Sequence, residues 1–406
     1  MNVPAPDALM RLRSGTPEYR RTSRVLFAAG FMGFAMLYVV QGILPSISRD
    51  FSLSPAAASL TLSLTTLPLA VAVIVAASWS EGQGRRALLV GAVLSAAALT
   101  LAASIAPNFG FLLVLRVLTG LVLGGLPAVA MAYIAEEFHP AGLGVAMGLY
   151  ISGTGLGGMT GRLVGGLLAS ASNWRVTMAI VGTVCLIGGL WVAARLPSSR
   201  NFVAVPGSMR KRLAGLRGPL RDPVIIRFAI CGFVLMGSFV SFFNYLQYRL
   251  VKAPFDLSPT LVSLVFILYL FGTFSANWMG RMSERRSLLI FGIAIMALGA
   301  LLSLANLLPL VLVGTAAMVF GFFGAHSVIS GWVNTWATKQ RAQSSALYLF
   351  GYHVGSSVAG FAGGLFYAVF GWPGEVGTVL VLLLLGFVVV LSLPSSKGGA
   401  SEAVPV

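Results

Sequence analysis

Four ionisable side chains interrupt long apolar stretches of this 406-residue chain: Arg116, Arg162, His326 and His353. A charged side chain inside a lipid bilayer costs at least about 2.5–3.5 kcal/mol, so it is retained for a purpose or neutralised by a neighbour. A buried guanidinium can bind an anion or a strong hydrogen-bond acceptor. An imidazole can gain or lose a proton near neutral pH. The four residues are therefore candidates for recognising a solute and a proton along a path through a membrane.

Each candidate also has a purely structural interpretation. An arginine can act as a clasp between helices, or it can extend toward the membrane surface. A histidine can stay neutral and hydrogen-bond its neighbours. At 1.5 Å per residue, Arg116 lies about 10 Å and Arg162 about 12 Å inside the same side of the membrane. The residue types alone leave both interpretations open.

Neutral polar side chains at similar depths complete the candidate path. Tyr38 and Gln41 lie in the first apolar span, and Asn244, Tyr245 and Gln247 lie in the seventh. Such side chains either line a polar cavity or hold helices together by hydrogen bonds.

The acidic residues are distributed differently, since all 11 lie in loops or at span ends. We expect no carboxylate at mid-membrane, which argues against a simple exchange of a proton for a cationic solute. Asp50 and the pair Glu136-Glu137 are fallback proton sites, although a solvated place at a helix end is the expected role for each.

Missing patterns exclude several kinds of chemistry. The chain has no Gly-x4-Gly-Lys-Ser/Thr loop for ATP phosphates, and its glycine-rich run lies inside an apolar helix instead of following a strand. The three histidines lack the spacing of metal ligands. The two cysteines, Cys185 and Cys231, lack metal or redox spacing. We expect no enzyme activity, no cofactor and no metal.

The composition identifies the elements that must position these residues. Hydrophobic residues make up 57% of the chain and charged residues 9%, whereas a soluble domain carries about 25% charged residues. Apolar runs of the length needed to cross a bilayer recur along the whole chain. We predict an all-α membrane protein with twelve transmembrane helices. Their expected spans are roughly 24–48, 57–79, 87–106, 109–135, 141–170, 174–195, 224–248, 258–280, 287–306, 309–333, 341–369 and 375–394.

The basic residues predict the orientation and the domains. With both termini in the cytoplasm, 21 of the 27 Lys and Arg residues are cytoplasmic and 4 lie on the opposite side, as the positive-inside rule favours. The net charge of +16 then reflects topology and contact with the lipid bilayer, so no nucleic acid partner is expected. The predicted parts are an N-terminal cytoplasmic tail (1–23), a six-helix bundle (24–195), a basic cytoplasmic linker (196–223), a second six-helix bundle (224–394) and a C-terminal cytoplasmic tail (395–406).

The two halves repeat each other at an offset of 198 residues. Leu149-Tyr150 aligns with Leu347-Tyr348 and Trp174 with Trp372. A stripe of small residues at four-residue spacing also repeats: Gly153, Gly157, Gly161 and Gly165 correspond to Gly351, Gly355, Ala359 and Gly363. Such a stripe lets two helix backbones approach closely, either for packing alone or as a seam that permits movement. Duplicated six-span units are typical of transporters.

These features together resemble the major facilitator superfamily over essentially the whole chain. The loop after the second span is similar to the family's gating-loop motif, with Glu81, Gly84, Arg85 and Arg86 at the motif positions; Ala77 and Glu81 replace the usual Gly and Asp. The fifth span is similar to the antiporter motif of the family's drug and metabolite exporters. Its matching residues are Gly148, Gly157, Gly161, Gly165 and Gly166, with Arg162 where Pro is usual.

Four segments also resemble the YnfM-type branch of bacterial inner-membrane exporters, namely Tyr133 to Glu137, Gly148 to Gly153, Gly161-Arg162 and Leu347 to Phe350. This resemblance implies two pseudo-symmetric six-helix bundles in the inner membrane, a monomer, and export of a small organic solute in exchange for protons by alternating access. The alternative is an importer or facilitator of a small organic anion, because the spans contain arginines without acids. Neither the residues nor the resemblance selects a solute among drugs, sugars and metabolites.

Overall fold

The computed structural model describes residues 11–79, 84–202, 215–337 and 340–394, and helices dominate this part of the chain. Ten helical segments in it are long and apolar enough to cross a membrane. Two further crossings complete the set. α7 (Pro140–Ala171) has 32 residues but a lower hydropathy because of its glycines, and α16 (Arg341–Leu391) is two helices joined across a kink at Gly371. The prediction of an all-α protein with twelve spans is confirmed.

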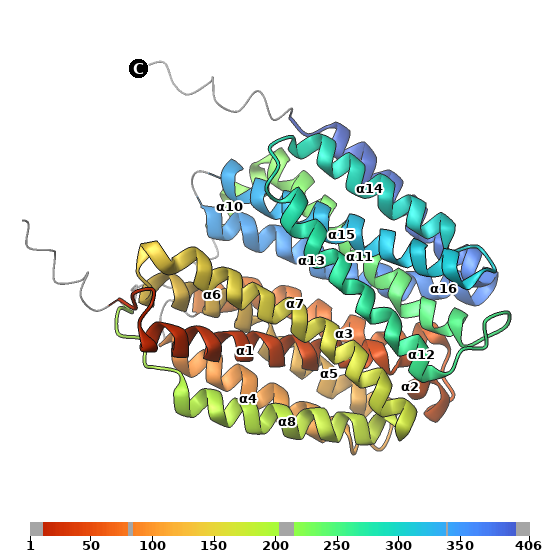
Figure 1. Cartoon of the computed structure of the whole chain (residues 1–406), viewed down its shortest axis with the longest axis horizontal. Helices are drawn as coiled ribbons and strands as arrows, with labels where there is room; N and C mark the ends of the chain where they lie inside the picture. The colour runs from red at the N-terminus through yellow and green to blue at the C-terminus, as the bar shows by residue number, and fades with distance from the viewer. Residues whose placement is uncertain (1–10, 80–83, 203–214, 338–339, 395–406) are drawn as a thin grey trace, which may run out of the picture. The chain divides into compact units, whose positions relative to one another are not determined.

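The chain forms two compact units, which Figure 1 shows in red to green and in green to blue. The first comprises residues 1–52 and 60–214, and the second comprises residues 53–59 and 215–406. The helices of the first half are α1 (Pro17–Gly42), α2 (Leu44–Asp50), α3 (Pro55–Trp79), α4 (Arg85–Ala103), α5 (Phe109–Leu123), α6 (Gly125–Glu137), α7 and α8 (Trp174–Arg195). Those of the second half are α10 (Arg217–Arg221), α11 (Pro223–Leu250), α12 (Pro259–Leu264), the 3-10 turn η2 (Val265–Leu268), α13 (Tyr269–Met279), α14 (Arg285–Leu302), α15 (Leu308–Trp336) and α16.

Side-chain caps begin several of these helices, because the first N–H groups of a helix have no partner within it. Asn108 accepts from Phe111 N at 2.9 Å to start α5, and Asn173 accepts from Val176 N at 2.9 Å to start α8. Asp222 accepts from Val224 N at 2.8 Å to start α11. Each cap lies just before an apolar run, as the sequence breaks predicted.

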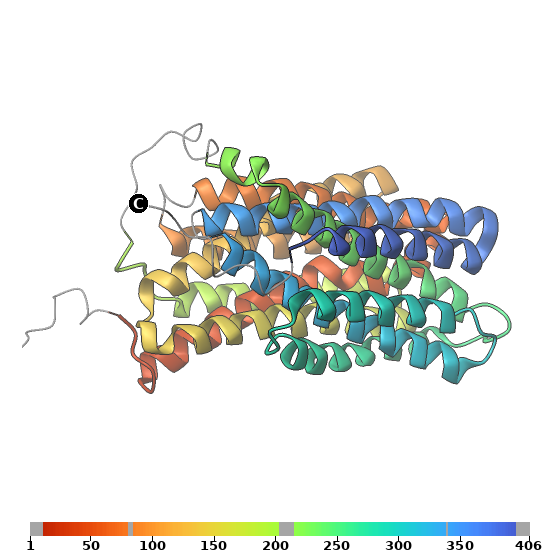
Figure 2. The same cartoon turned by 90° about the horizontal axis from the view of Figure 1, so that it is seen from above.

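Two predicted spans are irregular, and two others are joined by a sharp turn. The fourth is broken at Gly124 into α5 and α6, and the eighth contains η2 between α12 and α13. At Gly124 a Cβ atom would meet the Leu69 carbonyl oxygen and clash with the Ala72 side chain, so close contact with α3 explains the glycine. The eleventh and twelfth spans meet at Gly371, whose φ of 63° suits glycine, and Figure 2 shows the reversal of α16 in blue.

The repeated small-residue stripes form one close helix seam in each unit. On α7, Cβ atoms built on Gly153, Gly157 and Gly161 would clash with the backbone carbonyls of Phe27, Phe31 and Ala35 on α1. On α16, Gly351 and Gly355 approach the carbonyls of Ala229 and Phe233 on α11 in the same way. We call these two contacts the glycine seams. They place α1 and α11, the most enclosed spans, directly against the backbones of α7 and α16.

Replacing Gly157 by alanine is expected to destabilise the protein. The new methyl group would displace the backbone of Phe31, and overpacking of this kind costs roughly 1–3 kcal/mol. Gly155 on the same helix is the matched control, because nothing lies within 4 Å of its Cβ position and alanine favours helix by about 1 kcal/mol. Thermal unfolding of the purified proteins measures both effects. Equal midpoints for Gly157→Ala and Gly155→Ala would contradict the close seam.

Both cysteines are buried within helix interfaces. Cys185 on α8 and Cys231 on α11 are free thiols, with 5% and 2% of their surface exposed. They pack as small core residues, as their apolar surroundings predicted.

Candidate functional site

Arg162 lies at the centre of a polar cluster on the first glycine seam. Its Nε donates to Gln41 Oε1 at 2.5 Å, and its Nη1 donates to the carbonyl of Gly158 at 2.8 Å. The guanidinium lies over the Tyr38 ring, 3.7 Å from the ring centroid. We call Tyr38, Gln41, Gly158 and Arg162 the arginine cluster. The structure thus brings Arg162 of the fifth predicted span together with Tyr38 and Gln41 of the first.

The glycines of α7 make room for the arginine cluster. A Cβ on Gly158 would lie 3.2 Å from Arg162 Nη1 and 3.4 Å from the Tyr38 ring. The side chain of Arg162 is therefore held flat between α7 and α1, with 3% of its surface exposed. A guanidinium that stacks on an aromatic ring and faces an amide oxygen can exchange that oxygen for a carboxylate or carbonyl of a solute.

Arg116 has different surroundings, because it contacts backbone. Its guanidinium donates to the carbonyls of Thr61 at 3.1 Å, Met36 at 3.3 Å and Leu37 at 2.9 Å, and the residue is fully buried. It therefore ties α5 to α3 and α1. Of the two interpretations left open by the sequence, this geometry favours the clasp for Arg116.

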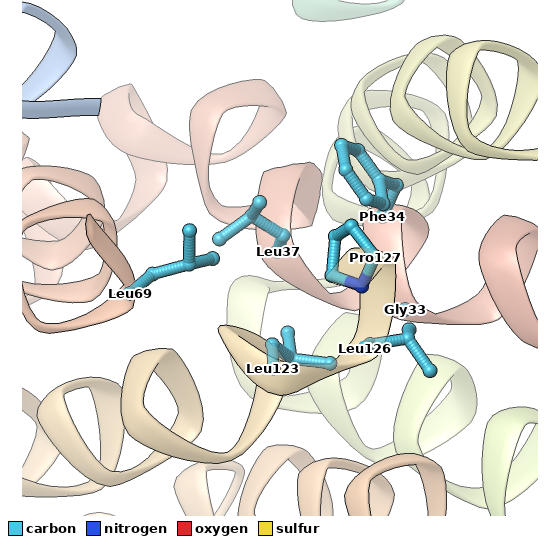
Figure 3. Close-up of a pocket in the computed structure, with 7 residues that line it drawn as sticks. All are labelled: Gly33, Phe34, Leu37, Leu69, Leu123, Leu126 and Pro127. Carbon is cyan, nitrogen blue, oxygen red and sulfur yellow. The ribbon is translucent and has the colours of Figure 1, made fainter. Parts of the chain in front are cut away.

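A small apolar cavity lies beside Arg116, whose contacts with α1 and α3 we call the clasp. It is lined by Gly33, Phe34, Leu37, Leu69, Leu123, Leu126 and Pro127, as Figure 3 shows, and its volume of about 10 Å³ is room for about one water molecule. Leu37 both lines this cavity and accepts a hydrogen bond from Arg116. The Phe34 ring also contacts Tyr38 of the arginine cluster, at a centroid distance of 6.2 Å. Sequence reasoning missed this cavity, because apolar residues in a membrane helix carry no signal of a binding role.

The two candidate histidines of the second unit form an aromatic cluster. His326 on α15 shares a hydrogen bond of 2.7 Å with the Tyr348 hydroxyl of α16. The Tyr352 ring lies between the histidines, 4.9 Å from His326 and 5.0 Å from His353 by ring centroids. His353 Nδ1 is buried and has no hydrogen-bond partner among the described residues. The sequence analysis missed the two tyrosines, which link the histidines.

Two of the three polar residues predicted on the seventh span, Asn244 and Tyr245, join helices. Tyr245 donates to the Gly360 carbonyl at 2.5 Å and Asn244 donates to the same oxygen at 3.3 Å, so both connect α11 to α16. Gln247 Nε2 donates to Phe243 within α11 at 3.4 Å. These contacts favour the role in helix packing that the sequence analysis left open.

The predicted gating loop braces helix ends. Arg85 Nη2 pairs with Glu136 Oε1 of α6 at 2.7 Å, and Arg86 donates to the carbonyls of Ala193 and Leu196 at the end of α8. These carbonyls are the unpaired acceptors at a helix C-terminus, which a cation stabilises. Gly84 immediately precedes α4, and Glu81 lies outside the described residues. Arg286 repeats this contact in the second unit by donating to the Leu391 carbonyl at 2.5 Å.

The expectation of a solvated helix end is wrong for Glu137, and Glu375, which the sequence analysis placed at a span end, is enclosed as well. Glu137 is 3% exposed and accepts from Asn201 N at 2.9 Å, while Glu136 is held by Arg85. Glu375 is fully buried. Asp50 remains partly exposed and pairs with Arg175, whose hydrogen bond lowers the pKa of the Asp50 carboxyl. Folding therefore buries residues at span ends that the sequence alone would place in contact with water.

The family follows from comparison of the whole chain with known proteins. The model of the Major Facilitator Superfamily matches residues 26–284 and 248–405. The chain belongs to the major facilitator superfamily. This transporter is 43% identical to the MFS-type transporter YybF of Bacillus subtilis over 377 residues, which cover 92% of this chain and 93% of the relative. It is 40% identical to the inner membrane transport protein YnfM of Escherichia coli over 379 residues, or 92% and 90% of the two chains.

Solved structures support the same fold for this transporter. A bacterial homologue of the human lysosomal transporter Spinster, in an inward-facing and unoccupied conformation, matches with a TM-score of 0.77 at 17% identity, covering 95% of this chain and 98% of that one. A D-xylose-proton symporter matches with a TM-score of 0.72 at 15% identity, covering 94% and 99%. The predicted resemblance to the family is confirmed, and the chain is a multi-pass membrane protein that moves a small solute.

Proposed function

We propose that this transporter exports a small organic solute across the bacterial inner membrane in exchange for protons, by alternating access with both termini in the cytoplasm. The observation that carries the proposal is the arginine cluster, in which a buried guanidinium faces an amide oxygen beside the glycine seam. A carboxylate or carbonyl of the solute replaces the Gln41 oxygen on Arg162. The charge-assisted hydrogen bond that results supplies both affinity and orientation.

The other candidate residues are proposed to serve the conformational change and proton sensing. Arg85 and Arg86 hold the ends of α6 and α8, and release of these contacts accompanies the change of conformation. His353 and His326 are the histidines assigned to proton sensing.

Two relatives support export over uptake. This transporter is 27% identical to the chloramphenicol resistance protein of Streptomyces lividans over 260 residues, and 26% identical to a multidrug resistance protein B homologue of Mycobacterium tuberculosis over 419 residues. Their names connect these relatives with resistance to drugs, which is the outcome expected when a solute is moved out of a cell.

A second candidate function is facilitated passage of a small organic anion. It is favoured by the placement of Arg116 and Arg162 within apolar spans, while the acidic residues of the first half lie outside spans or at their ends. The fixed positive charge would attract an anion in a medium of low dielectric constant.

A pH probe in inside-out vesicles separates the two functions. The vesicles are energised to be acidic inside, and drugs, sugars and organic anions are added one at a time. Antiport predicts that at least one compound makes protons leave through the wild-type protein and that vesicles without the protein do not respond. A silent panel, combined with equilibration of a labelled anion, would reject antiport and establish the facilitator.

A further inference from the structure

The carboxyl group of Glu375 is enclosed inside the second unit without a partner. The residue follows the kink at Gly371 and has no exposed surface. The Ser241 hydroxyl of α11 is the polar group beside it, but neither carboxyl oxygen makes a well-formed hydrogen bond within the described part of the chain. A Cβ on Gly363 would clash with both Ser241 Oγ and Glu375 Oε2, so this glycine opens the space that the carboxyl occupies.

The internal duplication shows that the fold does not require an acid at this place. At the offset of 198 residues, Glu375 corresponds to Thr177, which is buried and donates to the Asn173 carbonyl of its own helix at 2.9 Å. Gly165, the counterpart of Gly363, faces Val39 instead of a serine. In the first unit, the equivalent helix contact is therefore made by the Thr177 hydroxyl and the apolar side chain of Val39. The carboxyl is a specific addition to the second unit.

The charges around Glu375 favour its neutral form. Tyr245 of α11 and Tyr367 of α16 are the titratable groups that interact with Glu375, and both are phenols, which are neutral at pH 7. Arg249 of α11 interacts electrostatically with Tyr367 and donates to the carbonyls of Leu304 and Ala305. The ion pairs found in the described chain are Arg85–Glu136 and Arg175–Asp50, so no cation compensates Glu375 there. An enclosed carboxylate without compensation takes up a proton instead of remaining charged.

We infer that Glu375 is a proton-binding site of this transporter and carries the proton that is exchanged for the solute. In the conformation described here an O–H bond is formed at the carboxyl. When the helices separate and water reaches the site, that bond breaks and the proton passes to bulk water. The coupling role rests on the proposed function, whereas the binding of the proton does not. The sequence analysis had named His326 and His353 as the candidates for recognising a proton, and His353 lies 22 residues earlier on α16.

The binding step can be tested without any solute. Infrared spectroscopy of the purified protein in lipid nanodiscs detects the C=O stretch of a protonated carboxyl at neutral pH. We expect this band in the wild-type protein and in Asp256→Asn, where an exposed carboxyl is removed, and we expect Glu375→Gln to lack it. Ser241→Ala keeps the carboxyl and is expected to shift the band, because the neighbouring hydroxyl is lost. Identical spectra for wild type and Glu375→Gln would overturn the inference.

The coupling step uses the vesicle assay with whichever compound moves protons through the wild-type protein. We expect Glu375→Gln to reduce the solute-driven proton signal to background, and we expect Asp256→Asn, which removes an exposed carboxyl, to retain it. A full signal in Glu375→Gln would overturn the coupling role. If the infrared band depends on Glu375 but no compound moves protons, the proton site stands and the antiport proposal fails.

Discussion

Replacement of Arg162 by alanine is expected to reduce solute transport strongly while the amount of folded protein in the membrane is unchanged. Removal of an intramembrane charge does not hinder insertion, so folding is preserved. A lost hydrogen bond to a charged group costs about 1.5–3 kcal/mol, and each 1.4 kcal/mol corresponds to a factor of ten in affinity. The expected loss is therefore roughly tenfold to a hundredfold. Initial rates of solute movement, divided by the amount of folded protein, measure it.

Two neighbouring variants make this prediction specific. Arg162→Lys keeps the charge but lacks the planar fork that stacks on Tyr38, so partial transport is expected. Gln41→Glu places a carboxylate against the guanidinium and should block an anionic solute by forming an internal ion pair. If Arg162→Ala transports at the wild-type rate, the arginine cluster is a packing feature and the proposed recognition is wrong.

Substitution of Arg116 is expected to lower the stability of the protein and to leave transport largely unchanged, which is the opposite of the expectation for Arg162. Arg116→Lys should destabilise the protein by roughly 3–5 kcal/mol, because a single ammonium cannot reach three carbonyls on two helices and the charge remains enclosed. Arg116→Leu should cost less, about 1–3 kcal/mol, since it removes the charge together with the hydrogen bonds. Thermal unfolding in detergent gives the order of the two variants.

Transport by the Arg116 variants provides the control. Per folded molecule, Arg116→Leu should transport at close to the wild-type rate, because the clasp donates only to backbone. A large loss of transport in well-folded Arg116→Leu would mean that this guanidinium contacts the solute. A lysine variant more stable than the leucine variant would contradict the clasp itself.

The fold could be predicted because apolar length and basic loops are properties of the linear sequence. The twelve spans, the repeat and the helix starts at Asn108, Asn173 and Asp222 follow from these properties. The break at Gly124 could not be predicted, because its cause is the approach of α3, which is distant in sequence. The two glycine seams were predicted as stripes, but their partner helices appear only once the chain is folded.

The candidate site was predictable as a set of residue types and not as a set of contacts. Arg162, Tyr38 and Gln41 were singled out separately, and the structure joins them. The acceptors of Arg116 are backbone carbonyls, which every residue carries and no pattern reveals. Glu375 was assigned to a span end, because a linear reading assumes that helix ends meet water. The turn at Gly371 instead folds that end into the helix bundle.

The burial of Cys185 and Cys231 makes the natural chain almost silent toward maleimide reagents that do not cross membranes. A cysteine introduced at an exposed position, such as Ser14→Cys or Lys252→Cys, therefore reports the accessibility of that position, and neither native cysteine has to be replaced. Maleimide labelling of each variant in intact cells and in inverted vesicles shows on which side of the membrane the introduced cysteine lies. The same background allows opening and closing to be followed by thiol reactivity during turnover.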